Sequence, residues 1–364
     1  MNRRTLITSA MLSLALSVLA SCGGGGGGGG GDATASIGGS GGTGGGGSAP
    51  GTAAPTGATN VTEGVMTKGS IIVNGITFTD AAIALRSYDR PMTSANLQSG
   101  MVVKVLGTIS TSTTGTAQIA RVQTELRGTV QTVSANVQPP FFNVNGQKVI
   151  VSDTTIFSNL AGLGSLVPGS SFVEVHGQRD AANAIRASRV ELFGGSSLAD
   201  ELRGTITSLT ANTFILNGVT VNFGAQSIID PPGAILANGI LVEVHGSFIG
   251  GQFQAQRIHH EDSSDSDFKP SSEGRWEVEG YINGFTAHPG SFTVNGRTVR
   301  TSASTRFEGG NALNLANSVK IEAEGKLEGS TIVAEKISFR ETRIIVEGVA
   351  TAINVTARTV TILG

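Results

Sequence analysis

Phe142-Asn143-Val144-Asn145-Gly146 and Val173-Glu174-Val175-His176-Gly177 are two short segments that this chain of 364 residues repeats in a fixed order. Counterparts of the first occupy residues 71–75, 214–218 and 292–296, and counterparts of the second occupy residues 103–107, 242–246 and 321–325. Asn-Gly after an alternating apolar strand is a strong hairpin signal, because both residues tolerate the positive φ of a type I′ turn. Recurrence every 65–75 residues or so predicts small all-β units in tandem.

The Asn-Gly turns also predict the register of each hairpin. Counting outward from each turn places an apolar residue opposite an apolar residue in all four copies, which is what a strand with one buried face requires. The predicted cross-strand pairs are Ile71 with Phe78, Phe142 with Val149, Phe214 with Val221, and Phe292 with Val299.

Each copy contains further segments with the same order. A strand with a charged residue before Gly precedes each hairpin, at residues 63–64, 127–128, 203–204, 279–280 and 347–348. A looser stretch that has room for one helical turn follows the hairpin, and a strand of small and branched residues ends the copy. Three strands, a short turn and two strands favour five-stranded barrels of the oligonucleotide/oligosaccharide-binding (OB) type. Closed barrels also leave no sheet edge free to pair with a neighbour. Open β-sandwiches are the alternative.

The predicted fold class is therefore all-β, with tandem OB-like barrels behind a disordered Gly-rich tether. Residue 364 falls where the fifth hairpin should turn, so we expect the sequence to be part of a longer product. The predicted boundaries are a signal peptide at 1–22, a disordered Gly/Ser linker at 23–60, β repeats at 61–125, 126–200 and 201–262, a polar linker at 263–275, a fourth repeat at 276–340 and a partial fifth at 341–364.

The first 22 residues have the features of an export signal. Arg3 and Arg4 precede a short apolar run at residues 6–19, too short for a membrane span. Residues 19–22, Leu-Ala-Ser-Cys, resemble the cleavage box of bacterial lipoproteins, and Cys22 is the only cysteine. This resemblance implies that Cys22 becomes the acylated N-terminus, with palmitate among its acyl chains. The alternatives are an ordinary signal peptide and, from the paired arginines, twin-arginine export.

Residues 23–60 are rich in Gly, Ser, Thr, Ala and Pro, and such a chain buries too little apolar surface to fold. The segment is expected to act as a flexible tether. Gly rather than Asp at position 23 resembles the signal that sorts enteric lipoproteins to the outer membrane. The predicted location is the bacterial cell envelope. Within the envelope, Gly23 favours the outer membrane, with the barrels facing the periplasm or the cell surface.

Charge and composition restrict the partners. The chain has 25 basic and 27 acidic residues, and removal of Arg3 and Arg4 leaves 23 basic residues. A nearly neutral charge gives no electrostatic footprint for nucleic acid, and aromatic residues are only 5% of the chain, so stacking platforms are scarce. The expected partners are the membrane, through the lipid anchor, and an envelope protein or glycan.

His176 and His245 occupy equivalent positions in two copies, each two residues after a glutamate. Alternation places Val173 and Val175 inside the barrel, so Glu174 and His176 point outward, as do Glu243 and His245. A Glu–His pair can bind a transition metal or transfer a proton. Two ligands are too few for a tight site, so the expectation is that these are solvated strand positions.

The densest set of potential metal ligands lies in residues 259–267. Imidazoles and carboxylates at this spacing can hold a divalent cation, whereas charged Ser-rich runs are usually solvated linkers. The candidate ligands are His259, His260, Glu261, Asp262, Asp265 and Asp267. No nucleophile, phosphate-loop or dinucleotide motif appears, so the sequence gives no catalytic residue and no cofactor.

The strand that ends in Val-Asn-Gly, followed by Val-Glu-Val-His-Gly and a small-residue strand, resembles the bacterial repeats called domain of unknown function 5666. The resemblance covers residues 61–364 and implies a lipoprotein leader with a poly-Gly tract, but no catalytic or binding residues. The first copy departs most, since Leu106 precedes its Gly107. The expected function is a non-catalytic binding or scaffolding role in the envelope. The alternatives are carbohydrate or peptidoglycan binding and, third, a hydrolase.

Overall fold

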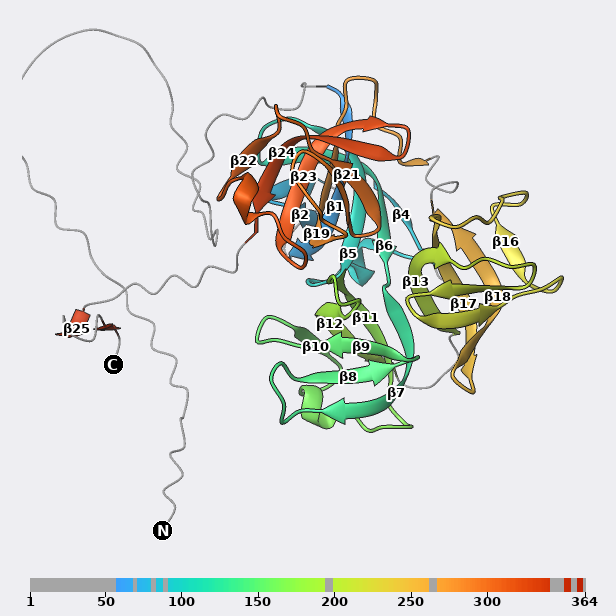
Figure 1. The fold of residues 1–364 in the computed structure, drawn as a ribbon. Coiled ribbons are helices and arrows are strands. Elements are labelled where there is room, and N and C mark those ends of the chain that lie inside the picture. The colour runs from blue at the N-terminus through green and yellow to red at the C-terminus, as the bar shows by residue number, and fades with distance from the viewer. Residues whose placement is uncertain are drawn as a thin grey trace, which may run out of the picture. The chain divides into compact units, whose positions relative to one another are not determined.

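The structure is a computed structural model that describes residues 57–67, 71–79, 83–87, 91–193, 199–261, 267–340, 350–354 and 359–362. These residues form an all-β chain whose complete helical segments are short 3-10 turns (Figure 1). Within these ranges no helix has the length and hydrophobicity needed to cross a membrane. The predicted signal peptide, Cys22 and the linker up to residue 56 lie outside the described residues.

The strands fall into four sets, which we call barrels 1 to 4. Barrel 1 contains β1 (Thr59–Thr67), β2 (Ile71–Val73), β3 (Ile76–Thr79), β4 (Ala84–Arg86), η1 (Ser94–Asn96), β5 (Val102–Ile109) and β6 (Thr114–Gln123). Barrel 2 contains β7 (Leu126–Ser134), β8 (Phe141–Val144), β9 (Gln147–Ile150), β10 (Ile156–Ser158), η2 (Leu163–Ser165), β11 (Phe172–Arg179) and β12 (Ile185–Phe193). Barrel 3 contains β13 (Asp200–Thr207), β14 (Thr213–Leu216), β15 (Val219–Asn222), β16 (Ile228–Asp230), β17 (Leu241–Ile249) and β18 (Gln252–His260). Barrel 4 contains β19 (Trp276–Asn283), β20 (Ser291–Val294), β21 (Arg297–Arg300), β22 (Arg306–Glu308), η4 (Ala312–Asn314), β23 (Lys320–Glu328) and β24 (Thr331–Phe339). A separate antiparallel hairpin consists of β25 (Ala350–Asn354) and β26 (Thr359–Ile362).

Each barrel closes through five strands that are equivalent from one barrel to the next. In barrel 2, β7, β8 and β9 pair antiparallel in sequence, β9 pairs parallel with β12, and β11 joins β12 back to β7. Barrels 1, 3 and 4 close through the corresponding pairs, so the prediction of small five-stranded OB-like barrels is confirmed. The sequence did not predict the sixth, three-residue strand of each barrel, such as β10, which pairs parallel with the last strand.

The predicted hairpin register is confirmed in all four copies. Ile71 faces Phe78, Phe142 faces Val149, Phe214 faces Val221, and Phe292 faces Val299. The turn Asn residues have φ between 48° and 52°, and the Gly residues that follow have φ between 72° and 85°. Both lie in the left-handed region that a type I′ turn requires.

Close packing links the Asn-Gly turn to the Gly of the first strand. Asn145 Nδ2 donates a hydrogen bond of 2.8 Å to the carbonyl oxygen of Arg127, and a Cβ added at Gly128 would lie 2.5 Å from the Asn145 side chain. In barrel 3, Asn217 Nδ2 lies 2.6 Å from the Arg203 carbonyl oxygen, and a Cβ at Gly204 would lie 2.4 Å from that amide. The Gly of the first strand therefore recurs together with the Asn-Gly turn, because a residue without a Cβ leaves room for the Asn side chain of the turn.

The second repeated Gly lies at a β-bulge. The register between β11 and β12 shifts between His176 and Gly177, and a Cβ at Gly177 would lie 2.4 Å from the carbonyl oxygen of Arg186. The same shift precedes Gly107, Gly246 and Gly325. Glycine is therefore needed at this position so that the two backbones can approach closely.

The barrels also pair with one another through their first strands. β7 and β13 pair antiparallel, placing Leu126 opposite Leu202, and β1 and β19 pair parallel. Barrels 2 and 3 consequently share one continuous apolar core, to which both leucines belong. The result is two 12-stranded sheets in place of four independent barrels.

The other barrel pairs make contact through hydrogen bonds and ion pairs. Ser188 Oγ donates to the Gly100 carbonyl oxygen (2.6 Å) and joins barrels 1 and 2, and Gln178 Nε2 donates to the Glu279 carbonyl oxygen (2.8 Å) and joins barrels 2 and 4. Arg203 joins barrel 3 to barrel 1 through Glu63 (3.9 Å) and to barrel 4 through Asn295 (3.4 Å). Every barrel therefore contacts the three others.

The hairpin phenylalanines should dominate the stability of their barrels. Phe142 and Phe214 are 0% exposed and Phe292 is 3% exposed. Replacing any of them by Ala should lower the free energy of unfolding by about 3–5 kcal/mol, because the change leaves a cavity in a closed core. Urea denaturation checks this, with the half-buried neighbour Phe141→Ala as the control. A loss below about 1 kcal/mol at two of the three positions would contradict the packing.

Candidate functional site: a charged junction between the barrels

The first strand of each barrel presents charged side chains on the barrel's outer face. Residues 125–128 and 201–204 both read Glu-Leu-Arg-Gly, and strand alternation buries each Leu in the core while its neighbours point outward. The antiparallel pairing of β7 with β13 then sets each Arg against the Glu of the other barrel. Arg127 pairs with Glu201, and Arg203 Nη1 lies 3.4 Å from Glu125 Oε2.

Glu261 and Glu63 extend this pairing. Arg203 Nε lies 2.5 Å from Glu261 Oε1, and Lys104 Nζ lies 3.9 Å from a carboxylate oxygen of both Glu63 and Glu261. Burial lowers the pKa of Arg203, but Glu261 and Glu125 outweigh burial, so the pKa is raised well above its ordinary value. Arg203 therefore stays charged inside the junction.

Aromatic rings complete the surroundings of Lys104, which is fully buried. Its Nζ lies 5.6 Å from the centre of the Phe268 ring and 5.8 Å from that of Trp276. Such contacts favour a desolvated cation. Phe268 lies within the predicted polar linker at 263–275, yet its side chain is buried.

The prediction that Glu174, His176, Glu243 and His245 are solvated is wrong. All four point away from the core of their own barrel, as alternation requires, but neighbouring barrels cover them and they are buried. His176 Nδ1 lies 2.9 Å from the Gln123 carbonyl oxygen, and its Nε2 lies 3.2 Å from Glu174 Oε1. His245 Nε2 lies 2.7 Å from Glu243 Oε1.

One set of three potential metal ligands forms among the described residues. Side-chain ligand atoms of Glu201, Glu243 and His245 all lie within 4.8 Å of one another, and all three residues are buried. Glu201 is the cross-strand partner of His245, a relation that depends on the register between β13 and β17. The set can hold a divalent cation, although Arg127 already donates to Glu201 and would compete with it.

The run at residues 259–267 is only partly the solvated segment that its composition indicates. His259 and His260 end strand β18 and are buried, and Glu261 is buried because it neutralises Arg203 and Lys104. Asp267 is exposed, while Asp262 and Asp265 lie outside the described residues. Metal binding by this run stays a prediction.

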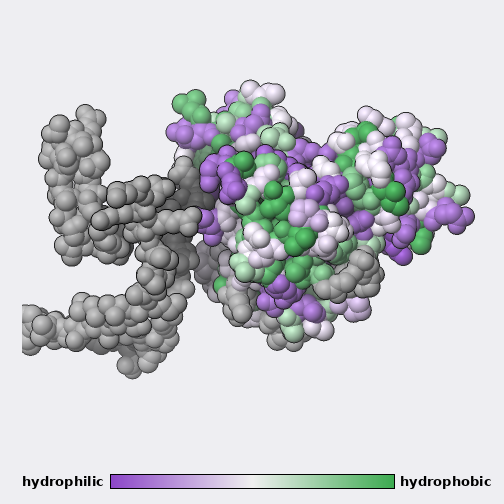
Figure 2. All heavy atoms as spheres, turned by 90° about the horizontal axis from the view of Figure 1, so that it is seen from below, coloured by the Kyte–Doolittle hydropathy of each residue, from purple (hydrophilic) through white to green (hydrophobic). Residues whose placement is uncertain are grey.

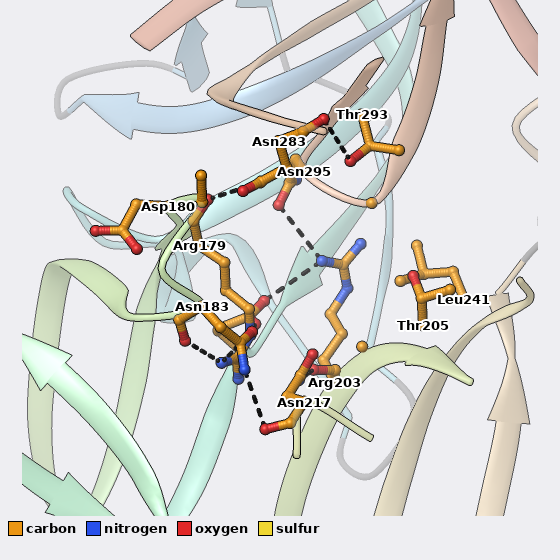
Figure 3. A pocket seen from close by; sticks show the side chains of 14 residues that line it. Arg179, Asp180, Asn183, Arg203, Thr205, Asn217, Leu241, Asn283, Thr293 and Asn295 are labelled. Atoms are coloured by element: carbon orange, nitrogen blue, oxygen red, sulfur yellow. Dashed lines mark hydrogen bonds and ion pairs between the residues drawn. The ribbon is translucent and has the colours of Figure 1, made fainter. Parts of the chain in front are cut away.

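A polar cavity of ≈ 270 Å³ lies where barrels 2, 3 and 4 meet (Figure 3). No aromatic residue lines it. Its polar lining includes Arg179 and Asn183 of barrel 2, Arg203 and Asn217 of barrel 3, and Asn283 and Asn295 of barrel 4. Two of these, Asn217 and Asn295, are the turn residues of the repeated Asn-Gly motif. The sequence did not predict this cavity, because its lining comes from three copies whose relative placement no local pattern specifies.

The ion pairs of Arg127 should be necessary for the junction of barrels 2 and 3. Arg127→Met should lower the free energy of unfolding by about 3–5 kcal/mol, because Glu174 and Glu201 would remain buried without this cation. Adding Glu174→Gln and Glu201→Gln to that variant should restore most of the loss, as measured by urea denaturation.

The matched control is the pair Arg300–Glu328, whose side chains are 50% and 65% exposed. Arg300→Met should cost about 1 kcal/mol at most. Equal losses for the two arginines would contradict a special role for the junction.

His259 should make stability fall in mild acid. Burial lowers the pKa of His259 from 6.5 to about 4, although Asp230, 3.0 Å away, acts in the opposite direction. Between these pH values the unfolded chain binds a proton that the folded chain does not, so stability decreases as pH falls from 6.5 to about 4. His259→Gln should make this decrease smaller in denaturation curves. An unchanged pH profile for His259→Gln would refute this.

Comparison with known proteins assigns the repeated unit to a protein family. A family model described as a domain of unknown function (DUF5666) matches residues 127–191, 203–259 and 279–338, which together make up half of the chain. Each match begins in the first strand of barrel 2, 3 or 4 and ends in the last strand of the same barrel. One family unit is therefore one barrel.

No curated protein matches the chain. Among solved structures, the chain is similar to Drosophila Unr CSD456 at 15% sequence identity, over 61% of this chain and 99% of that one. The TM-score is 0.15, and a likeness at that level carries no argument about function. On the strength of the three family matches, this chain belongs to the DUF5666 family.

Proposed function

We propose that this protein is a lipid-anchored protein of the bacterial cell envelope whose joined barrels act as a non-catalytic scaffold for other envelope components. The observation that carries this proposal is the use of the buried charges. Glutamates, arginines and a lysine that could serve as acids, bases or ligands form ion pairs across barrel boundaries. Buried ion pairs of this kind can fix relative orientation, which is what a scaffold needs.

The leader supports the anchoring part of the proposal. Cys22 stands at the end of an apolar leader, in a box typical of lipoproteins, and a Gly-rich segment separates it from β1. A composition of this kind is typical of linkers, and the proposal takes this segment to connect the lipid anchor with the barrels.

The surface supports the interaction part. Figure 2 shows a face on which apolar side chains gather between polar and charged ones. Exposed large apolar residues of the described chain include Ile235, Ile249 and Leu313. Exposed apolar side chains of this kind are available for contact with another macromolecule, which is what the proposed role requires.

A second role, binding of envelope carbohydrate, is favoured by the cavity between barrels 2, 3 and 4. Its lining of amide, hydroxyl and guanidinium groups suits a ligand that is recognised by hydrogen bonds. The two roles are compatible, because a scaffold that is held in the envelope can also bind a glycan there.

Replacement of the anchor cysteine tests the main proposal. Cells that express the full chain should incorporate a palmitate analogue into the wild type and not into Cys22→Ser. The variant should also move from the membrane fraction to the periplasmic fraction. Incorporation of the palmitate analogue into Cys22→Ser, or its absence from the wild type, would refute the assignment of Cys22 as the lipid anchor.

The non-catalytic role is tested in the same material. The purified protein should release no product from peptidoglycan or model glycosides, while cross-linking in cells should join it to envelope components. If the wild type releases product and His245→Ala does not, the protein is an enzyme and the non-catalytic role is wrong. Glu328→Gln, an exposed change outside the junction, serves as the matched control.

A further inference from the structure

Glu277 is a buried carboxylate at the interface between barrels 1 and 4, and the described residues provide no ion pair for it. It lies on β19, whose parallel pairing with β1 sets Thr62 beside it (Figure 1). Glu125 and Glu201 occupy the equivalent position in barrels 2 and 3, three residues before the repeated Gly, and both pair with an arginine. A buried carboxylate without such a cation is far more stable in its uncharged form.

The charged groups on the neighbouring strands strengthen this preference. Glu324 of β23 is the cross-strand partner of Glu277, and Glu322 lies two residues earlier on the same strand. Like charges directly opposite one another on paired strands are destabilising. Lys336 and Arg340 also act on Glu277, but each already neutralises another carboxylate. Lys336 Nζ lies 2.9 Å from Glu324 Oε2, and Arg340 pairs with Glu322.

The remaining charged groups of this interface are also occupied. Glu279, two residues further along β19, has Lys320 Nζ at 2.6 Å from its Oε1. Arg275 Nε lies 2.7 Å from Glu335 Oε2. Barrel 1 contributes the uncharged side chain of Asn74. Within the part of the chain that the structure describes, each cation of this interface therefore has a carboxylate other than Glu277.

These surroundings change how Glu277 titrates. Burial, followed by the Glu322 and Glu324 carboxylates, raises the pKa of Glu277 well above its ordinary 4.5. Lys336 and Asn74 act in the opposite direction and are outweighed. Between pH 4.5 and the raised value, the folded chain holds a proton that the unfolded chain has released. Stability should therefore fall as the pH rises through this range.

We propose that the interface between β1 and β19 is a proton-sensitive device, which is closed while Glu277 carries a proton and loosens when Glu277 ionises. An ionised Glu277 would be desolvated and would face the Glu324 carboxylate. Separation of β1 from β19 admits water and relieves both costs. The inference goes beyond the proposed scaffold and does not depend on it, because it concerns only how two barrels hold together.

The single tryptophan of the chain reports on this interface directly. Trp276 adjoins Glu277, is 3% exposed, and has Val61 of β1 as its register partner. Trp276 fluorescence of the full chain is measured from about pH 5 to about pH 9. Its emission should move to longer wavelength and its quenching by acrylamide should increase as the pH rises, because opening of the interface exposes the indole to water.

Three variants assign this shift to Glu277. Glu277→Gln mimics the protonated acid, so it should abolish the shift. Glu324→Gln should move the midpoint of the shift to lower pH, because it removes the opposing carboxylate and leaves Lys336 to pair with Glu277. Glu328→Gln is the matched control on the same strand, since Glu328 is 65% exposed, and it should keep the wild-type profile.

Urea denaturation of the wild type and Glu277→Gln at each pH completes the test. The difference between the two is used because His259 changes stability in the opposite direction between pH 6.5 and about 4. Glu277→Gln should be at least as stable as the wild type at about pH 9, and a lower stability there would show that the interface needs the charge.

That result would overturn the proposal. So would a fluorescence shift that persists in Glu277→Gln, or a wild type without any shift. If Glu277→Gln does not fold, judged by circular dichroism, Glu324→Gln decides alone, and an unmoved midpoint overturns the proposal.

Discussion

A charged side chain that is removed from water needs an opposite charge beside it, and this requirement governs how the four barrels fit together. Arg127 and Lys104 are essentially fully buried, and neither meets all its carboxylates within its own barrel. Arg127 forms an ion pair with Glu201 of barrel 3, and Lys104 forms one with Glu261 of the same barrel. A barrel separated from the others would keep these charges on its surface, in water. Burial of the ionised groups and assembly of the barrels are therefore one event, because removing either partner would leave the other unpaired.

Short-range sequence patterns predicted what short-range interactions determine. The Asn-Gly turns set the hairpin register, so the pairing of Phe214 with Val221 followed from counting residues. The glycines that marked the repeat proved to be places of close approach, at Gly204 against Asn217 and at Gly246 against the Gln254 carbonyl oxygen. Local geometry explains both the fold of one barrel and the recurrence of its motifs.

The site was less predictable because its parts come from different copies. Alternation correctly pointed Glu243 and His245 away from the core of barrel 3, but no local pattern reveals that other barrels cover that face. Glu261 followed a histidine pair in a Ser-rich acidic run, and composition alone suggested solvent. Its role became visible only when Arg203 and Lys104 were placed beside it. The cavity around Arg179 needed three barrels at once, while Cys22 lies outside the described residues and remains a sequence-based prediction.

The parallel pairing of β1 with β19 has a consequence for how such proteins evolve. In an open array each repeat contacts only its neighbours, so units can be gained or lost by recombination with little effect on the remainder. Here the first and fourth units are direct neighbours, and each unit also contacts the other two. Deleting one unit would remove partners from all three that remain, and inserting one would separate surfaces that now match. The four barrels of this assembly therefore depend on one another for their partners, unlike the units of an open array.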